Sequence, residues 1–179
     1  MYINYKYNLN SFALYKSSDF NIPRYHDIQF LQCEYNKIRF LPILPINLKE
    51  LDCSNNRLKS ISKLPDSLKQ IYCYSNRLNN LSNIPNNLIK LNFSYNKLKK
   101  LSILPYTLVY LECENNKLIN LSILPINLKE LLCRNNNIIL LPKIYNNTTI
   151  LYYDRKKIKF INEHNENIIQ IKIYYFINF

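Results

Sequence analysis

The sequence of 179 residues contains no glycine, and this absence excludes one class of functional site. Gly-rich loops that wrap phosphate groups need a backbone without side chains, so the sequence predicts no such loop. Tight turns with a left-handed backbone must rely on asparagine, the residue that tolerates this conformation best after glycine. We therefore expect Asn in the turns of this chain.

Long hydrophobic runs are also missing, although 47% of the residues are hydrophobic. No stretch of about 18 apolar residues is present, which argues against a membrane-spanning helix. The first 20 residues, MYINYKYNLNSFALYKSSDF, contain no continuous apolar segment and no cleavage site of the kind found in signal peptides. We expect a folded domain with its own core, located in the cytoplasm.

Acidic residues are few: 12 Asp and Glu stand against 24 Lys and Arg, which gives a formal net charge of +12. This balance suits an acidic partner such as nucleic acid or an anionic membrane. It also fits a Lys-rich coding bias without functional meaning. The two interpretations separate only when the charges are placed on a surface.

The clearest feature of the sequence is a repeat of 20 residues. Asparagine recurs at one position of six successive repeats, with Leu or Ile two residues after it and five residues before it. These asparagines are Asn36, Asn56, Asn76, Asn96, Asn116 and Asn136, and a proline follows in five repeats, at Pro45, Pro65, Pro85, Pro105 and Pro125. Six copies in register indicate a stacked repeat architecture.

Each repeat contains a short segment of alternating polarity, in which Leu51 and Cys53 face one side and Asp52 the other. One such strand cannot bury its apolar side alone, so the copies must stack into a parallel sheet. The remaining residues are too few for a crossover helix, and the proline disfavours one further. We predict a right-handed solenoid with short parallel strands on its concave face, extended or 3₁₀-like return segments on its convex face, and little α-helix.

The consensus L-x-C-x-x-N-x-L-x-x-L-x-x-L-P-x-x-L-x-x resembles the leucine-rich repeats, and most closely the short, proline-containing type of secreted bacterial effectors. It departs from that type in placing Cys where Val is more frequent. Residues 20–23, Phe-Asn-Ile-Pro, are similar to the FNIP repeats of amoebae and of giant viruses that infect them. That similarity implies a viral origin and action inside a host cell.

The two ends of the repeat array depart from the consensus, as capping repeats do. We assign residues 1–27 to an N-terminal cap, residues 28–161 to the repeats and residues 162–179 to a C-terminal capping strand. Near the C-terminal end Thr148 replaces Leu and Lys156 replaces the repeated Asn. Ile168, Ile171 and Ile173 keep the register and predict a further strand.

All five cysteines fall at one position of the repeat, which Phe93 fills in the remaining copy. They are Cys33, Cys53, Cys73, Cys113 and Cys133. A phenylalanine at an equivalent position indicates a core site, where free cysteine acts as a small hydrophobe. Metal binding and disulfides are the alternatives, but no C-x-x-C pair is present and only His26 and His164 could assist. We predict reduced, buried thiols and neither a metal nor a cofactor.

The repeated asparagines resemble the asparagine ladder of the leucine-rich repeats. A buried Asn amide can donate and accept, and so satisfies backbone groups of its own and adjacent turns. Glycosylation sequons occur elsewhere, for example at Asn80 and Asn146, but none involves the ladder. Alanine at Asn83, in a return segment, is expected to be better tolerated than alanine at Asn96.

The residue after each ladder asparagine is basic in five repeats: Lys37, Arg57, Arg77, Lys97 and Lys117. This basic edge could follow a nucleic-acid backbone. The alternative is a solvated flank that keeps the solenoid soluble.

The outward strand positions predict a different surface, in which acids and tyrosines gather. We assign partner binding on the concave face to Glu50, Asp52, Tyr72, Tyr74, Tyr110, Glu112, Glu114, Arg134 and Tyr152. Aromatic residues amid mixed charge fit a protein-binding surface better than a nucleic-acid groove. The alternative is that these tyrosines reflect composition, since the chain has 16.

An enzyme is hard to build from these residues. Glu112 and Glu114 would lie on an open face, and neither histidine belongs to a Cys or Ser constellation for nucleophilic catalysis. We predict a non-enzymatic protein–protein interaction module whose partner the sequence does not identify. Nucleic-acid binding through the basic edge and a structural role in a particle are the alternatives.

Overall fold

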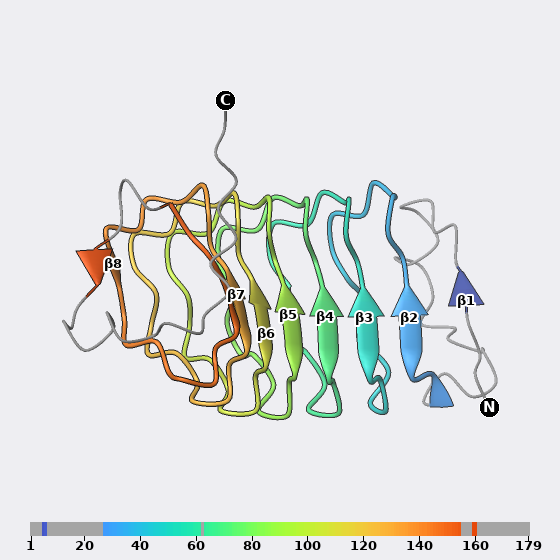
Figure 1. Ribbon diagram of the computed structural model, residues 1–179. Helices are drawn as coiled ribbons and strands as arrows, with labels where there is room; N and C mark the ends of the chain where they lie inside the picture. Colours follow the sequence, from blue (N-terminus) through green and yellow to red (C-terminus); the bar gives the residue numbers. More distant parts are fainter. Residues whose placement is uncertain (1–4, 7–26, 62, 155–158, 161–179) are drawn as a thin grey trace.

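The computed structural model describes residues 5–6, 27–61, 63–154 and 159–160 of the chain. Eight strands lie side by side in one sheet, in the order β1-β2-β3-β4-β5-β6-β7-β9, with their arrowheads pointing the same way (Figure 1). They are β1 (Tyr5–Lys6), β2 (Phe30–Gln32), β3 (Glu50–Asp52), β4 (Gln70–Tyr72), β5 (Lys90–Asn92), β6 (Tyr110–Glu112), β7 (Glu130–Leu132) and β9 (Ile150–Tyr152). A second, two-stranded sheet pairs β8 (Leu140–Leu141) with β10 (Lys159–Phe160).

The register of the main sheet follows the sequence repeat. From β2 to β9 neighbouring strands are parallel, and each residue pairs with the residue 20 positions further along the chain. Leu51 pairs with Ile71 in this way, and Leu131 pairs with Leu151 at the same offset. The described residues contain almost no helix. The predicted parallel-sheet solenoid of leucine-rich-repeat type is therefore confirmed.

The core lies between the sheet and the return segments, where each repeat contributes the same set of apolar side chains. In one repeat these are Leu51, Cys53, Leu58, Ile61 and Leu64, all buried. The five cysteines are free and buried, and Phe93 is fully buried in the same column. The cysteines thus lie in the core, as the sequence predicts.

Each return segment ends in a turn that begins at the repeated proline. The amide of Leu48 donates to the carbonyl of Pro45 at 3.2 Å, and the later repeats form the same turn. The last such turn lacks the proline, yet the amide of Thr148 donates to the carbonyl of Tyr145 at 2.9 Å. The hydroxyl of the buried Thr148 donates to the carbonyl of Leu128 at 2.8 Å, which explains how threonine is accommodated where leucine is the rule.

The left-handed turns correct one prediction. Seven of the described residues have a positive φ, and four are asparagines, as expected: Asn55, Asn83, Asn115 and Asn135. The other three are Tyr35, Ser75 and Tyr95. They adopt this conformation because hydrogen bonds between repeats hold it, as where the amide of Tyr95 donates to the carbonyl of Glu114 at 2.9 Å. Tertiary hydrogen bonds therefore override residue preference.

The ends of the chain lie mostly outside the described residues. Within the expected N-terminal cap only β1 and Asp27 are described, and β1 pairs in parallel with β2. The strand expected around Ile168–Ile173, Lys156 and the Phe-Asn-Ile-Pro segment fall outside, so the domain boundaries stay predictions. In the portion that the structure describes, no helix is long and apolar enough to traverse a bilayer.

Candidate interaction surface

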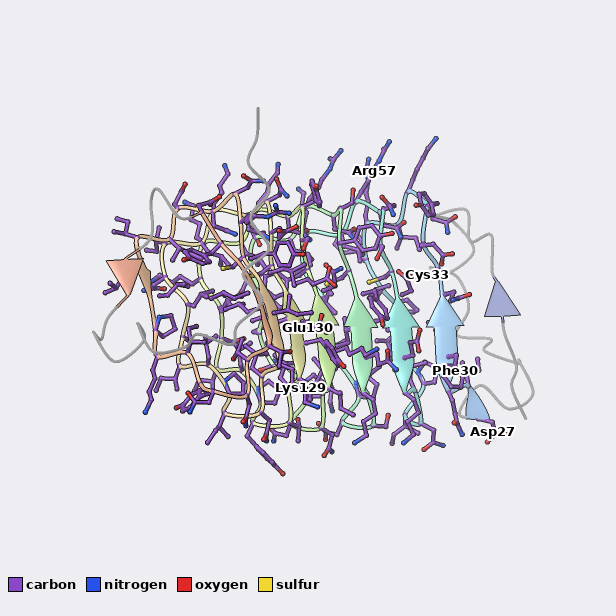
Figure 2. The ribbon with its side chains drawn as sticks, in the orientation of Figure 1. Asp27, Phe30, Cys33, Arg57, Lys129 and Glu130 are labelled. Carbon is purple, nitrogen blue, oxygen red and sulfur yellow. The ribbon has the colours of Figure 1, made fainter. Side chains whose placement is uncertain are left out.

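The outward side chains of the main sheet form a grid, which we call the sheet face. The grid has three columns: the first residue of each strand, the third residue of each strand, and the second residue after the strand ends. The predicted partner-binding residues all lie on it: Glu50, Asp52, Tyr72, Tyr74, Tyr110, Glu112, Glu114, Arg134 and Tyr152 are each partly exposed. Phe30 and Glu130 mark its two halves in Figure 2. The fold thus brings the predicted residues, which come from five repeats, onto one continuous surface.

The charge of the sheet face is opposite to that of the chain. From β2 to β9 its grid holds seven carboxylates, of Glu34, Glu50, Asp52, Glu112, Glu114, Glu130 and Asp154, against the cations Lys90 and Arg134. The whole chain has a formal net charge of +12. This separation of charge makes the face locally acidic on a basic molecule.

The cation Arg134 is held by two neighbours on the face. Its Nε donates to Glu114 Oε1 at 2.7 Å, and its guanidinium carbon lies 5.1 Å from the centroid of the Tyr152 ring. The hydrogen bond that Arg134 donates to Glu114 raises the pKa of the guanidinium. An ion pair and a cation–π contact therefore act on the same guanidinium.

The cation Lys90 has an aromatic neighbour on the next strand, since its Nζ lies 5.0 Å from the centroid of the Tyr110 ring. In the adjacent column Asn92 Nδ2 donates to Glu112 Oε2 at 2.6 Å. Partial burial, followed by the charges of Glu114 and Glu130, raises the pKa of Glu112. Like charges thus remain close together in this half of the face.

The two tyrosines of one repeat, Tyr72 and Tyr74, have different surroundings. The hydroxyl of Tyr72 donates to Gln70 Oε1 at 2.8 Å, and burial together with Glu50 and Asp52 raises its pKa. Tyr74 stands in its column between Ser54 and Ser94, both buried although they face outward. The side-chain oxygens of both serines have no hydrogen-bond partner among the described residues.

The ladder asparagines make the same hydrogen bonds in successive repeats. Asn96 Nδ2 donates to the carbonyls of Cys73 and Phe93, both at 3.0 Å, and Asn96 Oδ1 accepts from the amide of Leu78 at 2.9 Å. Asn56, Asn76, Asn116 and Asn136 repeat this arrangement and are also buried. Asn36, in the first repeat, is partly exposed and donates to carbonyls of its own turn. The five buried amides therefore tie neighbouring repeats together.

The basic edge follows the carboxyl ends of the strands. Lys37, Arg57, Arg77, Lys97 and Lys117 are all exposed. The backbone amides of Arg57, Arg77 and Lys97 donate to the preceding repeat at 2.8 to 2.9 Å, so the row has the spacing of the stack. Arg57 extends from this edge, beyond the strand arrowheads (Figure 2). The fold thus keeps the basic edge and the sheet face as separate surfaces.

A second polar ladder, at the amino ends of the strands, was missed by the sequence analysis. In the repeats of Pro65, Pro85, Pro105 and Pro125, the residue two positions after the proline donates a side-chain hydrogen to a carbonyl of the preceding repeat at 2.7 to 3.3 Å. Its members are Ser67, Asn87, Thr107, Asn127 and, after Tyr145, Asn147. The signal was present, since this position always holds a short polar residue, but Asn is so frequent in the chain that it did not stand out.

Metal-binding chemistry finds no support in the described ranges, where no group of three or more His, Cys, Asp or Glu side chains is placed to hold an ion. The cysteine column has poor thiolate character because burial raises the pKa of Cys73 to about 12. Thiolate is the form that binds metal and reacts as a nucleophile. These cysteines are accordingly packing residues.

No protein-family model and no curated protein matches the sequence. Among solved structures, YopM from Yersinia enterocolitica WA-314 is 29% identical with a TM-score of 0.61, over 75% of this chain and 35% of YopM. The leucine-rich-repeat domain of a Shigella effector is 28% identical with a TM-score of 0.55, over 63% of this chain and 62% of that domain.

The functional domain of InlJ from Listeria monocytogenes, which includes a cysteine ladder, has the same fold. It is 24% identical with a TM-score of 0.59, over 80% of this chain and 38% of that one. This chain therefore spans less than two thirds of each of the three proteins. The similarity to FNIP repeats and a viral origin stay predictions. The chain is a leucine-rich-repeat solenoid of 20-residue repeats, similar to those of YopM and the Shigella effector.

Proposed function

We propose that this chain is a non-enzymatic protein-binding module that holds its partner on the sheet face. The observation that carries the proposal is the gathering of tyrosines and carboxylates on one face of a basic molecule. Tyrosine is enriched at protein interfaces, because its rigid ring supplies contact area and its hydroxyl a hydrogen bond. The similarity to an effector's repeat domain supports a protein partner and a place of action inside a cell.

The rigidity of the face also supports binding. Its side chains stand on strands joined in register, and the Asn ladder fixes the turns that follow. Gln70 orients Tyr72, and Glu114 and Tyr152 orient Arg134. Side chains that are already ordered lose less conformational entropy when a partner binds.

Nucleic-acid binding is the second candidate, because the basic edge forms an exposed row of five cations. Neighbouring repeats place these cations about 4.8 Å apart along the stack, which a phosphate backbone could follow. The acidic sheet face would repel phosphates, so the two candidates require different surfaces. Variants of each surface can therefore separate them.

Affinity capture with three baits tests the proposal. The baits are the wild-type chain, the face variant Tyr72→Ala/Tyr74→Ala and the edge variant Arg57→Glu/Arg77→Glu/Lys97→Glu. We expect the wild-type and edge baits to retain the same protein, identified by mass spectrometry, and the face bait to lose it. Retention by the face bait together with loss by the edge bait would contradict the proposal. Thermal melting of all three baits provides the folding control.

A further inference from the structure

The C-terminal half of the sheet face shows how this surface holds a guanidinium group. Arg134 lies between Glu114 on one side and the ring of Tyr152 on the other, with Nε 2.7 Å from the carboxylate and the guanidinium carbon 5.1 Å from the ring centroid. The three residues come from three consecutive repeats. Because the repeats are in register, the same arrangement can form wherever these residue types recur at the same offsets.

Four repeats earlier, the same acceptors recur without the arginine. Glu34 and Tyr72 stand 80 positions before Glu114 and Tyr152, and Glu50 stands 80 positions before Glu130. The place of Arg134 is taken by Ser54, while Asp52 replaces Leu132 and adds a carboxylate beside Tyr72. Among the described residues the one ion pair is that of Arg134, so no cation there pairs with these N-terminal acids.

Ser54, which stands in the place of Arg134, adds an observation of its own. Its side chain faces the sheet face, is 0% exposed, and its Oγ has no hydrogen-bond partner among the described residues. A buried hydroxyl without a partner costs free energy that an added donor would recover. Burial, followed by the charges of the Glu50 and Asp52 carboxylates, raises the pKa of Tyr72, so this ring lies close to negative charge.

We propose that Glu34, Glu50, Asp52 and Tyr72, which we call the N-terminal corner, bind an arginine side chain presented by a protein partner. This inference rests on the proposed function and names the chemistry of the partner. Arginine fits better than lysine because a planar guanidinium can stack on the tyrosine ring and donate to two carboxylates at once. The bound group would occupy the position that Arg134 occupies in its own cluster.

A labelled hexa-arginine peptide tests the corner directly by fluorescence anisotropy, with hexa-lysine as the comparison of equal charge. The chain has a formal net charge of +12, so non-specific electrostatics opposes both peptides and any binding reports a local acidic site. We expect hexa-arginine to bind roughly tenfold more tightly than hexa-lysine. Equal affinity for the two peptides would overturn the assignment of arginine.

Single substitutions test whether hexa-arginine binds at the N-terminal corner. Tyr72→Ala and Asp52→Asn should each weaken hexa-arginine binding by roughly tenfold. Tyr106→Ala, a tyrosine that is 71% exposed on a return segment, should leave the affinity unchanged. Ser54→Arg supplies the arginine from the chain itself and should abolish peptide binding. If Ser54→Arg fails to fold, the first two variants still decide the outcome, and equal losses in Tyr72→Ala and Tyr106→Ala would overturn the proposal.

Three results show whether this inference and the proposed function stand or fail separately or together. If a captured protein is lost by the face variant but is not displaced by hexa-arginine, sheet-face binding holds and the arginine assignment fails. If the face variant retains the captured protein while the edge variant loses it, and hexa-arginine does not bind, both proposals fail. Displacement of the captured protein by hexa-arginine, with no effect of hexa-lysine at equal concentration, supports both.

Discussion

Replacing Asn96 by alanine tests how the repeats are held together. The amide makes three donor contacts, to the carbonyls of Cys73, Phe93 and Ser94, and its oxygen accepts from the amide of Leu78. Asn96 is 8% exposed, so water does not readily replace these bonds. Alanine removes all of them and leaves a cavity at the edge of the core.

The magnitude follows from which backbone groups lose their last partner. The carbonyl of Cys73 also accepts from Asn76 at 3.2 Å, and the carbonyl of Phe93 accepts from Asn116 at 3.0 Å. The amide of Leu78 has no second acceptor among the described hydrogen bonds, because there it donates to Asn96 Oδ1 alone. One orphaned buried donor costs about 1–3 kcal/mol. We therefore expect Asn96→Ala to lower the free energy of unfolding by about 2 kcal/mol.

Urea unfolding of matched variants measures this effect. Asn80→Ala is the control, because Asn80 is exposed and lies two residues beyond Leu78; Asn83 is unsuitable, since its φ of 58° disfavours alanine. Asn96→Asp should be worse than Asn96→Ala, because a carboxylate oxygen would then face the carbonyls of Cys73 and Phe93. Equal urea concentrations at the unfolding midpoint for Asn80→Ala and Asn96→Ala would refute the reasoning.

Three further changes test other parts of the structure. Tyr95→Asn should raise the free energy of unfolding by about 0.5–1 kcal/mol, since Tyr95 has a φ of 55° and asparagine tolerates this conformation better; a lower melting temperature would contradict this. Ser67→Ala should cost about 1 kcal/mol through loss of the hydrogen bond that its hydroxyl shares between the carbonyls of Ile46 and Leu48, whereas Ser82→Ala, at an exposed site, should cost almost nothing. Burial raises the pKa of Cys73 from 9.0 to about 12, so its thiol ionises first in the unfolded chain. Its stability contribution is complete below pH 9 and is lost as the pH rises towards 12, by about 1.4 kcal/mol per pH unit. Cys73→Val should give a shallower loss of stability between pH 8 and pH 10, and an unchanged slope would count against a buried neutral thiol.

The sequence predicted the stacking well because one period fixes both register and burial. Leu51 and Ile71 pair as the repeat requires, and Phe93 identified the cysteine column as core. The side chains that point outward from the sheet were predicted from the alternation of polar and apolar residues alone. A strict repeat therefore specifies which side chains share a column, since equivalent positions of successive repeats must stack.

The contacts between columns could not be predicted, because they depend on side-chain direction. Arg134 reaches Glu114 in the repeat before it and Tyr152 in the repeat after it, and alternation does not state which neighbour a long side chain selects. The left-handed conformation of Tyr35 and Tyr95 likewise comes from hydrogen bonds to the next repeat. Both features arise only after the repeats have stacked.

The most direct test of sheet-face binding is the affinity of the purified chain for the captured protein, measured for three forms at two salt concentrations. Wild type, Tyr72→Ala/Tyr74→Ala and Arg57→Glu/Arg77→Glu/Lys97→Glu are compared at about 50 and 200 mM salt, which spans the range where phosphate contacts weaken steeply. We predict that the tyrosine variant loses roughly thirtyfold in affinity, the expected size of an aromatic hot spot, while the edge variant and the change in salt have small effects. A large loss in the edge variant, with a steep fall in wild-type affinity between the two salt concentrations and no loss in the tyrosine variant, would contradict the account.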